Sequence, residues 1–421
     1  MNKYIKRNLE DDLVEASKQF PVIMITGPRQ VGKSTVLNYV TRDNEVANEV
    51  CFDDIEIRKD ALEDPKLFLE KYGTPLIIDE FQYVPELLSY IKLIVDKKNR
   101  ESLYADVESN GLYYLTGSQN FLSMSEVQES LAGRVCIENL YGLSTREING
   151  DNIDLFIPNI ELLKKRKPTK RLEINTLFER ILKGSFPALY NSDVEKDLNK
   201  FYKSYINTYL ERDIKQLIGP QNEVKFYKFM ISLAARTAQE LNLNDICQDV
   251  EISYHIANEW LSIMKNTGLV YLLEPFSGNI IKRVVKSPKI YFMDTGLASY
   301  LVGYYDAKTL ENSAYNGAIF ETYVISEIIK NFAYNGVETK TKLSYYRDNH
   351  KNEIDLLIDD RNILYPIEIK KSMQPKKDAI KNFSVLNDVK GKEVGTGIVL
   401  CNCEKIIPID TKNYFVPIEY I

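Results

Sequence analysis

Hydrophobic and polar positions alternate in two different ways along the first third of the chain. Between residues 21 and 147, short apolar runs are separated by longer stretches with helical patterning. Short apolar runs are typical of buried strands, and the longer patterned stretches are typical of helices. The apolar runs predict strands at Val22–Thr26, Val50–Asp53, Leu76–Ile78 and Leu112–Thr116. Strands that alternate with helices in this order favour a parallel α/β sheet.

The pattern changes after this region. Residues 150–172 are rich in charge and show no clear period, so we place a boundary or an insertion there, and residues 173–215 are helical in pattern. Residues 226–300 predict helices, a turn, further helices and a two-stranded ribbon, which is the order of a winged helix. From Gly317 onward, a helix is followed by several short strands. We therefore expect four parts, at residues 1–150, 151–225, 226–300 and 301–421.

Composition restricts the class of protein. With 421 residues, 44% of them hydrophobic and 27% charged, the chain is expected to be soluble and to contain several domains. The charged N-terminal stretch MNKYIKRNLEDDLVE does not resemble a secretory signal, and no run approaches the roughly 18 apolar residues of a membrane helix. Five cysteines without a CxxC pair and only two histidines argue against a zinc site. We expect a reduced, cytoplasmic protein with no membrane partner.

The net charge of −6 argues against a uniformly basic nucleic-acid binder, but it leaves room for local basic patches. Three such patches exist, and each is equally well interpreted as a solvated charge run. They are Lys164-Lys165-Arg166-Lys167, Lys282-Arg283 with Lys286 and Lys289, and Lys370-Lys371 with Lys376-Lys377.

The stretch VIMITGPRQVGKST fits the phosphate-loop pattern, with an apolar strand before it and a helical run after it. Glycines at 27 and 32 allow backbone amides to surround a phosphate, Lys33 reaches the β- and γ-phosphate oxygens, and the Ser34 hydroxyl ligates Mg²⁺. ATP and Mg²⁺ are therefore the expected cofactors. The nucleotide-binding set is Gly27, Pro28, Arg29, Gln30, Val31, Gly32, Lys33, Ser34 and Thr35.

The second half of a nucleotide site should be an acid at the end of a neighbouring strand. In TPLIIDEFQ, Asp79 ends an apolar run and is expected to hold Mg²⁺, and Glu80 is expected to orient and deprotonate the attacking water. In LYYLTGSQN, Ser118 or Gln119 is placed to sense the γ-phosphate. In SLAGRV, Arg134 is a candidate charge stabiliser, in cis or from a neighbouring subunit, and pairing with a structural acid is the alternative.

At this point the chain resembles the prokaryotic AAA-type ATPases that carry a C-terminal module of unknown function. The resemblance rests on the motifs GPRQVGKST, FDD, IIDEFQ, LTGSQN, SLAGRV, GSFP, ERDI, YFMDTGL and NGAIFETYV, in this order. It implies an AAA-type ATPase domain at 1–150 and a helical extension and linker at 151–225. It further implies a winged helix at 226–300 and a domain similar to restriction endonucleases at 301–421.

The stretch EIDLLIDDRNILYPIEIKKS places charged residues within two apolar strands joined by a short turn. Because side chains alternate faces along a strand, a hairpin would bring Asp355, Glu368 and Lys370 to one edge of the sheet. Two carboxylates there would hold Mg²⁺ or Mn²⁺, and Lys370 would orient water or stabilise the transition state. The set resembles the D…(E/Q)xK signature of PD-(D/E)XK nucleases, and a structural ion cluster is the alternative.

The helix preceding these strands adds one more acid. In GAIFETYVISEIIKNF, Glu321 stands alone on an otherwise apolar stripe, where an uncompensated carboxylate would be costly. A metal ion or Lys370 is expected to compensate it. The resemblance to nucleases, which often place a helical acid here, makes Glu321 the third candidate metal ligand.

Three functions fit these features. The first is an Mg²⁺-dependent ATPase that couples hydrolysis to a nuclease-like module acting on DNA. The second is an ATP-driven regulatory switch whose nuclease-like scaffold does not cleave. The third is a DNA-binding regulator that contacts DNA through its winged helix, with phosphate contacts from Lys282, Arg283, Lys286 and Lys289. ATP, DNA and a second copy of the chain are the candidate partners.

Overall fold

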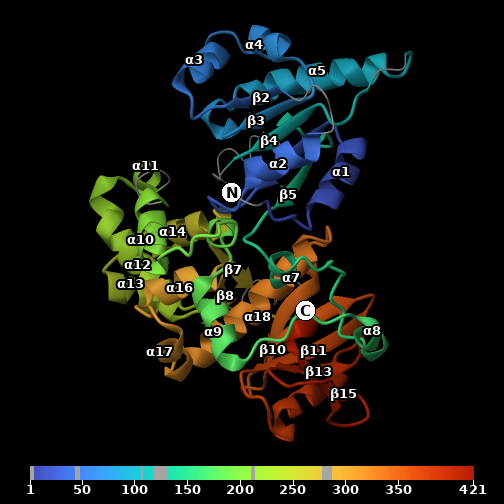
Figure 1. Ribbon diagram of the computed structural model, residues 1–421, viewed down its shortest axis with the longest axis vertical. Helices are drawn as coiled ribbons and strands as arrows, with labels where there is room; N and C mark the ends of the chain where they lie inside the picture. Colours follow the sequence, from blue (N-terminus) through green and yellow to red (C-terminus); the bar gives the residue numbers. More distant parts are fainter. Residues whose placement is uncertain are drawn as a thin grey trace.

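A computed structural model of the chain describes residues 4–42, 48–105, 108–117, 127, 130–209, 214–276 and 287–421. In Figure 1 an N-terminal α/β part lies at the top, a mainly helical middle part at the left, and a C-terminal α/β part at the lower right. The fold class predicted from the sequence is confirmed: a parallel-sheet P-loop domain is followed by a helical part and a separate C-terminal α/β domain.

The N-terminal sheet has five parallel strands in the order β2-β3-β4-β1-β5. The four predicted strands are all present, and the fifth was not foreseen. The strands are β1 (Val22–Thr26), β2 (Asn48–Cys51), β3 (Leu76–Asp79), β4 (Tyr113–Thr116) and β5 (Val135–Asn139).

Both faces of this sheet are covered, which explains why its strands are continuous apolar runs. Val22 and Met24 of β1 pack into one hydrophobic cluster with α3, α4 and α5, while Ile23 and Ile25 pack into another with α1 and α2. The helices are α1 (Glu10–Gln19), α2 (Lys33–Thr41), α3 (Ile55–Glu63), α4 (Pro65–Tyr72) and α5 (Leu87–Glu101).

The middle part follows the predicted order of helices, turn, helix and ribbon. Trp260, Leu261 and Met264 are buried as expected, and a short strand, β6, adds a third antiparallel strand to the ribbon in the order β6-β8-β7. Its elements are α9 (Ile174–Lys183), α10 (Leu198–Tyr209), α11 (Lys215–Ile218), α12 (Glu223–Ala235), β6 (Gln239–Glu240), α13 (Leu243–Val250), α14 (Tyr254–Asn266), β7 (Val270–Leu273), β8 (Lys289–Phe292), α16 (Thr295–Leu301) and α17 (Ala307–Asn312).

The C-terminal part contains the predicted hairpin. β10 and β11 pair antiparallel across a turn at Arg361 and Asn362, whose φ angles of 48° and 69° suit a tight hairpin. The sheet order is β14-β15-β13-β11-β10-β9, and β11, β13 and β15 run parallel. The main elements are α18 (Asn316–Ala333), α19 (Thr339–Lys342), β9 (Leu343–Arg347), β10 (Glu353–Asp360), β11 (Ile363–Lys370), β13 (Gly397–Cys401), β14 (Ile407–Pro408) and β15 (Asn413–Pro417).

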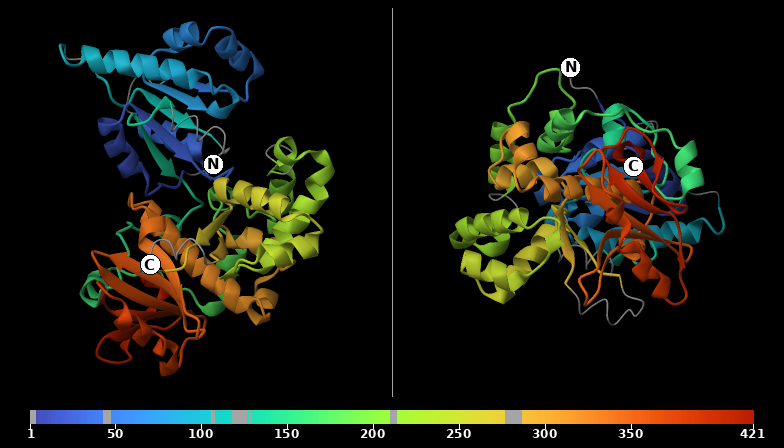
Figure 2. Two further views of the ribbon diagram at one scale, coloured as in Figure 1. Left: turned by 180° about the vertical axis from the view of Figure 1, so that it is seen from behind. Right: turned by 90° about the horizontal axis from the view of Figure 1, so that it is seen from below.

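Helix α18 lies between the middle part and the C-terminal sheet, where it contacts β8, α16 and β11 (Figure 2). It is buried on nearly all sides, so Glu321 is not the only polar residue enclosed along it; Glu327, Lys330 and Asn331 are buried too. None of the helices in the described ranges combines the length and the apolar composition of a membrane-spanning segment.

Arg7 joins the N-terminal and C-terminal parts of the molecule. Its buried guanidinium donates to the carbonyl oxygens of Val31 at 2.9 Å and Tyr141 at 2.9 Å, and to the Tyr334 hydroxyl at 2.8 Å. It also forms a buried ion pair with Glu147 at 3.0 Å. Around it, apolar residues from all three parts form one continuous hydrophobic cluster.

We expect Arg7→Met to be strongly destabilising, because it leaves the Glu147 carboxylate buried without its cation. Breaking a buried pair in this way costs about 3–5 kcal/mol, which urea unfolding would measure. The double variant Arg7→Met/Glu147→Gln should recover part of the loss. Lys6→Met is the matched control, because the Lys6–Asp11 pair is exposed and worth less than about 1 kcal/mol. Equal effects at positions 6 and 7 would contradict the role assigned to Arg7.

Candidate functional site

The predicted phosphate loop connects β1 to α2. Gly32 has a φ of 91° and Gly27 a φ of 139°, conformations that favour glycine, and a Cβ at Gly27 would lie 2.0 Å from the Leu140 carbonyl oxygen. α2 begins at Lys33 and has no acid in its first turn, so its N-terminus is suited to an anion. Pro28, Arg29, Gln30, Val31, Ser34 and Thr35 lie in this loop and first turn, as the sequence predicts.

Lys33 is buried and its ammonium donates to the carbonyl oxygens of Gly27 at 3.0 Å and Pro28 at 2.9 Å. The side chain therefore folds back over the loop it belongs to. These contacts hold a positive charge at the centre of the loop, where a phosphate would bind.

Asp79 ends β3 beside the phosphate loop. Its Oδ1 accepts a hydrogen bond from the Ser34 hydroxyl at 2.8 Å and another from the Thr116 hydroxyl. The parallel order β3-β4-β1 creates this proximity, because the carboxyl ends of the three strands meet at one edge. The two side chains expected to hold Mg²⁺ thus lie in direct contact, and a hydroxyl and a carboxylate suit this ion.

Glu80 follows with a positive φ of 56° and lies beside the same loop. Gln82 donates a hydrogen bond to its carboxylate. Burial raises the pKa of Glu80 above its usual range, although the hydrogen bond from Gln82 and the charge of Lys33 act in the opposite direction. Ser118 and Gln119, the candidate γ-phosphate sensors, lie outside the described residues.

Arg134 lies at the wrong edge of the sheet for a catalytic role in cis. Its carbonyl oxygen accepts from the Val22 amide at the start of β1, whereas the phosphate loop follows the end of that strand. Strand β1 has five residues. Its first and last residues are four steps of about 3.3 Å apart, which separates the two edges by roughly 13 Å. Its side chain pairs with Asp96 at 2.6 Å, which is the structural alternative.

A cavity of about 300 Å³ adjoins the phosphate loop. Gly32, Thr35 and Val36 form one wall, and Tyr4 and Ile5 of the N-terminal segment contribute to another. Tyr4 stacks on Tyr39 of α2, with ring centroids 4.2 Å apart. Sequence reasoning did not find this N-terminal contribution, because no motif marks it.

The middle part also contacts the phosphate loop. Gly268 lies in the turn between α14 and β7 with a φ of 71°, and a Cβ there would lie 2.8 Å from Pro28 Cδ. The turn therefore packs against the loop as closely as glycine permits.

In the C-terminal part, the hairpin brings Asp355, Glu368 and Lys370 together as expected. Asp355 Oδ2 accepts from the Ile369 amide at 2.8 Å, and Lys370 donates to Glu368 Oε1 at 2.7 Å. Glu368 Oε2 is buried and has no hydrogen-bond partner in the part of the chain that the structure describes, which leaves an oxygen able to accept a cation. Burial and the nearby Asp355 carboxylate raise the pKa of Glu368 to about 8.

Glu321 joins this cluster, but its compensating partners were not predicted. The carboxylate accepts from Tyr291 at 2.7 Å and lies 3.4 Å from the ammonium of Lys289, both on β8. Burial, followed by the Asp355 charge, raises the pKa of Glu321 to about 7. Among the described residues, no three acidic, histidine or cysteine side chains are close enough together to hold a metal.

A cleft of about 620 Å³ opens over the hairpin. Its acidic residues are Glu353, Asp355, Glu368 and Asp378, and its basic residues are Lys370, Lys376 and Lys381. The lysines of such a cleft suit the phosphates of a ligand, whose charge they would neutralise. The carboxylates between them suit a cation.

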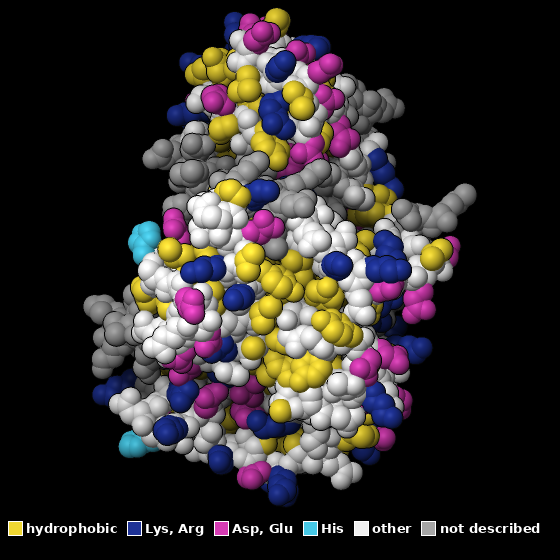
Figure 3. All heavy atoms as spheres, turned by 90° about the vertical axis from the view of Figure 1, so that its left-hand side faces the viewer, with side chains coloured by type: hydrophobic (Ala, Val, Ile, Leu, Met, Phe, Trp, Pro, Cys, Tyr) yellow, Lys and Arg dark blue, Asp and Glu magenta, His cyan; other side chains and the backbone are white. Residues whose placement is uncertain are grey.

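Of the four ribbon residues predicted to contact phosphates, the structure describes Lys289 and does not test the other three. Lys289 is buried, with 3% of its side chain exposed, so it cannot reach DNA in this arrangement. Lys282, Arg283 and Lys286 lie outside the described residues. On the face shown in Figure 3, Lys and Arg side chains are interspersed with Asp and Glu around a hydrophobic patch.

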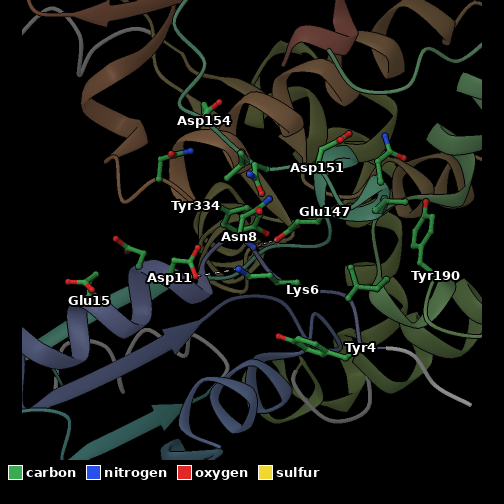
Figure 4. A pocket seen from close by; sticks show the side chains of 18 residues that line it. Tyr4, Lys6, Asn8, Asp11, Glu15, Glu147, Asp151, Asp154, Tyr190 and Tyr334 are labelled. Carbon is green, nitrogen blue, oxygen red and sulfur yellow. Dashed lines mark hydrogen bonds and ion pairs between the residues drawn. The ribbon is translucent and has the colours of Figure 1, made fainter. Parts of the chain in front are cut away.

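A groove of about 840 Å³ lies between α1, α7 (Thr145–Asn149) and the end of α18 (Figure 4). Its negative charge would repel phosphates, so it is not a candidate for a nucleotide or a nucleic acid. Six carboxylates line it, from Asp11, Asp12, Glu15, Glu147, Asp151 and Asp154.

We expect Gly268→Ala to weaken binding of a fluorescent ATP analogue by about tenfold, the equivalent of about 1.4 kcal/mol, because the added methyl group displaces Pro28. Gly303→Ala is the matched control: its φ is 88°, but no atom lies within 4 Å of the added Cβ. Both variants place an alanine at a positive φ, so fluorescence titration separates backbone strain from contact with the loop. Unchanged affinity in Gly268→Ala would contradict the packing argument.

Comparison with known families agrees with the geometry of the N-terminal site. Residues 19–149 match a family described as an AAA domain. Residues 174–308 and 316–421 match two domains of unknown function, DUF8612 and DUF4143. Uncharacterised proteins of Mycobacterium tuberculosis and Mycobacterium bovis are each 28% identical over 371 residues, which is 88% of this chain and 75% of the relative.

Solved structures show more distant similarity. A Walker-type ATPase of Pyrococcus abyssi is 12% identical with a TM-score of 0.41, over 71% of this chain and 96% of its own. The ORC2 protein of Aeropyrum pernix is 14% identical with a TM-score of 0.33, over 72% of this chain and 93% of its own. The family match and the five-stranded parallel sheet together identify the N-terminal part as a P-loop ATPase domain of the AAA type.

Proposed function

We propose that this chain hydrolyses ATP at the phosphate loop and that its C-terminal domain cleaves nucleic acid. The contact between Ser34 and Asp79 carries the first half of this proposal. A hydroxyl and a carboxylate in contact beside an anion-binding loop are the ligands that Mg²⁺ uses in P-loop enzymes. When bound, the ion neutralises charge that develops on the phosphates.

The chain's own residues divide the work of hydrolysis. Loop amides and Lys33 bind the β- and γ-phosphates, and Glu80 accepts the proton of the attacking water. Water oxygen then bonds to the γ-phosphorus as the bond to the ADP oxygen breaks, so ADP and inorganic phosphate leave. The cavity beside Thr35 and Val36 is the place for the adenine, with Tyr4 at its edge.

The cleft over the hairpin carries the second half of the proposal. Asp355, Glu368 and Glu321 are the proposed ligands of Mg²⁺ or Mn²⁺. In the arrangement described these carboxylates are too far apart to hold a metal, so the ion would have to draw them together. Glu368 Oε2, which has no hydrogen-bond partner among the described residues, fits this role. Lys370 would orient the water or stabilise the negative charge of the transition state. Lys376 and Lys381 would contact backbone phosphates. DNA is the proposed substrate, and an ATP-driven switch without cleavage is the alternative.

Lys33→Ala should abolish ATP binding, because the loop loses its only side-chain ammonium. Glu80→Gln should bind ATP but lower kcat by about 10²- to 10⁴-fold, the usual contribution of a general base. Phosphate release and nucleotide titration measure the two effects separately. Lys66→Ala, on the exposed face of α4, is the control. Full turnover by Glu80→Gln would remove it from the mechanism.

Glu368→Gln and Lys370→Met should abolish nicking of supercoiled DNA in Mg²⁺ or Mn²⁺ while ATP turnover continues. The reason is that both side chains belong to the cleft and neither contacts the phosphate loop. Single-stranded DNA and RNA should be assayed in parallel, with and without ATP. If the wild-type protein cleaves none of them, the nuclease proposal fails and the switch is favoured.

A further inference from the structure

Lys289 reaches the acidic cluster from a different part of the molecule. It begins β8, a strand of the middle-part ribbon whose next three residues, Ile290, Tyr291 and Phe292, are all buried in the hydrophobic core. By strand alternation, Lys289 and Tyr291 share one face of the strand. Both side chains are directed at the C-terminal acids, as their contacts with Glu321 show.

The ammonium of Lys289 is surrounded by three carboxylates. Its Nζ lies 2.5 Å from Glu353, 3.4 Å from Glu321 and 3.9 Å from Asp355. Burial by itself would lower the pKa of Lys289, but the charges of Glu321, Asp355 and Glu353 outweigh it and raise the pKa. The lysine is therefore fully charged at neutral pH.

Neighbouring contacts hold the ribbon in place. Arg347 of β9 pairs with Glu240 of β6 at 2.8 Å and with Glu353 at 3.7 Å. The Tyr345 hydroxyl donates to the Ser287 carbonyl oxygen at 2.5 Å, two residues before Lys289. The ammonium is thus positioned by a set of contacts between the two parts.

We propose that Lys289 is a tethered cation that occupies the acidic cluster, so that a divalent metal binds there only by displacing it. The inference rests on the metal site of the proposed function. Mg²⁺ binds carboxylate oxygens at a distance of about 2.0–2.1 Å. Oxygens drawn this close around the ion leave no room for an ammonium group among them. Two cations in this space would also repel strongly.

A second observation supports a cation site here. Glu368 is 9% exposed, and its Oε2 has no partner although Lys370 and Lys289 both lie in the cluster. The two lysines leave this oxygen unsatisfied, whereas a metal held with Asp355 would satisfy it. The cluster therefore has carboxylates that could close around a metal, but Lys289 lies among them and keeps them apart.

The test is Mn²⁺ binding to the full chain, measured by calorimetry and by the electron paramagnetic resonance of free Mn²⁺ with Mg²⁺-ATP absent. Lys289→Met should lower the Kd at the C-terminal cluster by at least about tenfold, and Lys289→Arg should not. Lys33→Ala in every background removes binding linked to the phosphate loop. Lys265→Met is the charge-matched control, because Lys265 is exposed on α14.

A second measurement uses the wild-type chain, in case Lys289→Met does not fold. Acetylation of lysines followed by mass spectrometry should find Lys289 protected without metal and labelled when Mn²⁺ is added, with Lys265 labelled throughout. Asp355→Asn should abolish the Mn²⁺-dependent increase.

The proposal is overturned if folded Lys289→Met binds Mn²⁺ no more tightly than wild type. It is equally overturned if saturating Mn²⁺ leaves Lys289 protected in the wild-type chain. Tighter Mn²⁺ binding without any nucleic-acid cleavage would support the tethered cation and reject the nuclease. Failure of the tethered-cation proposal can therefore be distinguished from failure of the nuclease proposal.

Discussion

The buried guanidinium of Arg7 is the contact on which the arrangement of this molecule depends. It fixes a carbonyl of the phosphate loop, a carbonyl after β5, the Glu147 carboxylate and the hydroxyl of Tyr334. Buried backbone carbonyls and carboxylates need donors, and one planar group with five N–H bonds satisfies four elements at once. The phosphate loop is therefore positioned by the C-terminal domain as well as by its own sheet.

Two rigid elements connect the phosphate loop to the acidic cluster. Helix α18 contacts Arg7 through Tyr334, and carries Glu321 about 20 Å away at 1.5 Å per residue. In the middle-part ribbon, strand β7 follows Gly268, which packs on Pro28. The neighbouring strand β8 carries Lys289, whose ammonium contacts the C-terminal acids.

Electrostatics explains how a chain with a net charge of −6 can contain a site for phosphates. The buried carboxylates of the C-terminal cluster are neutralised from two sides, by Lys289 from the ribbon and by Lys370 from β11. Lys370, Lys376 and Lys381 line the cleft beside these carboxylates. Charge in this protein is distributed locally, so the net value says little about its partners.

The sequence by itself determined the elements and motifs whose physics is local. The phosphate loop follows from glycine spacing, the hairpin from two apolar runs with a turn, and the helix-rich middle from periodicity, since these signals lie within a few residues. Only the tertiary structure decided which distant side chains meet. Arg134 lies at the far edge because β5 pairs beside β1, and Arg7 meets Tyr334 across 327 residues. The sequence places Lys289 in a basic run on a predicted ribbon, which suggests an exposed side chain that contacts phosphates. Only the packing of the ribbon against α18 and β10 surrounds it with three carboxylates.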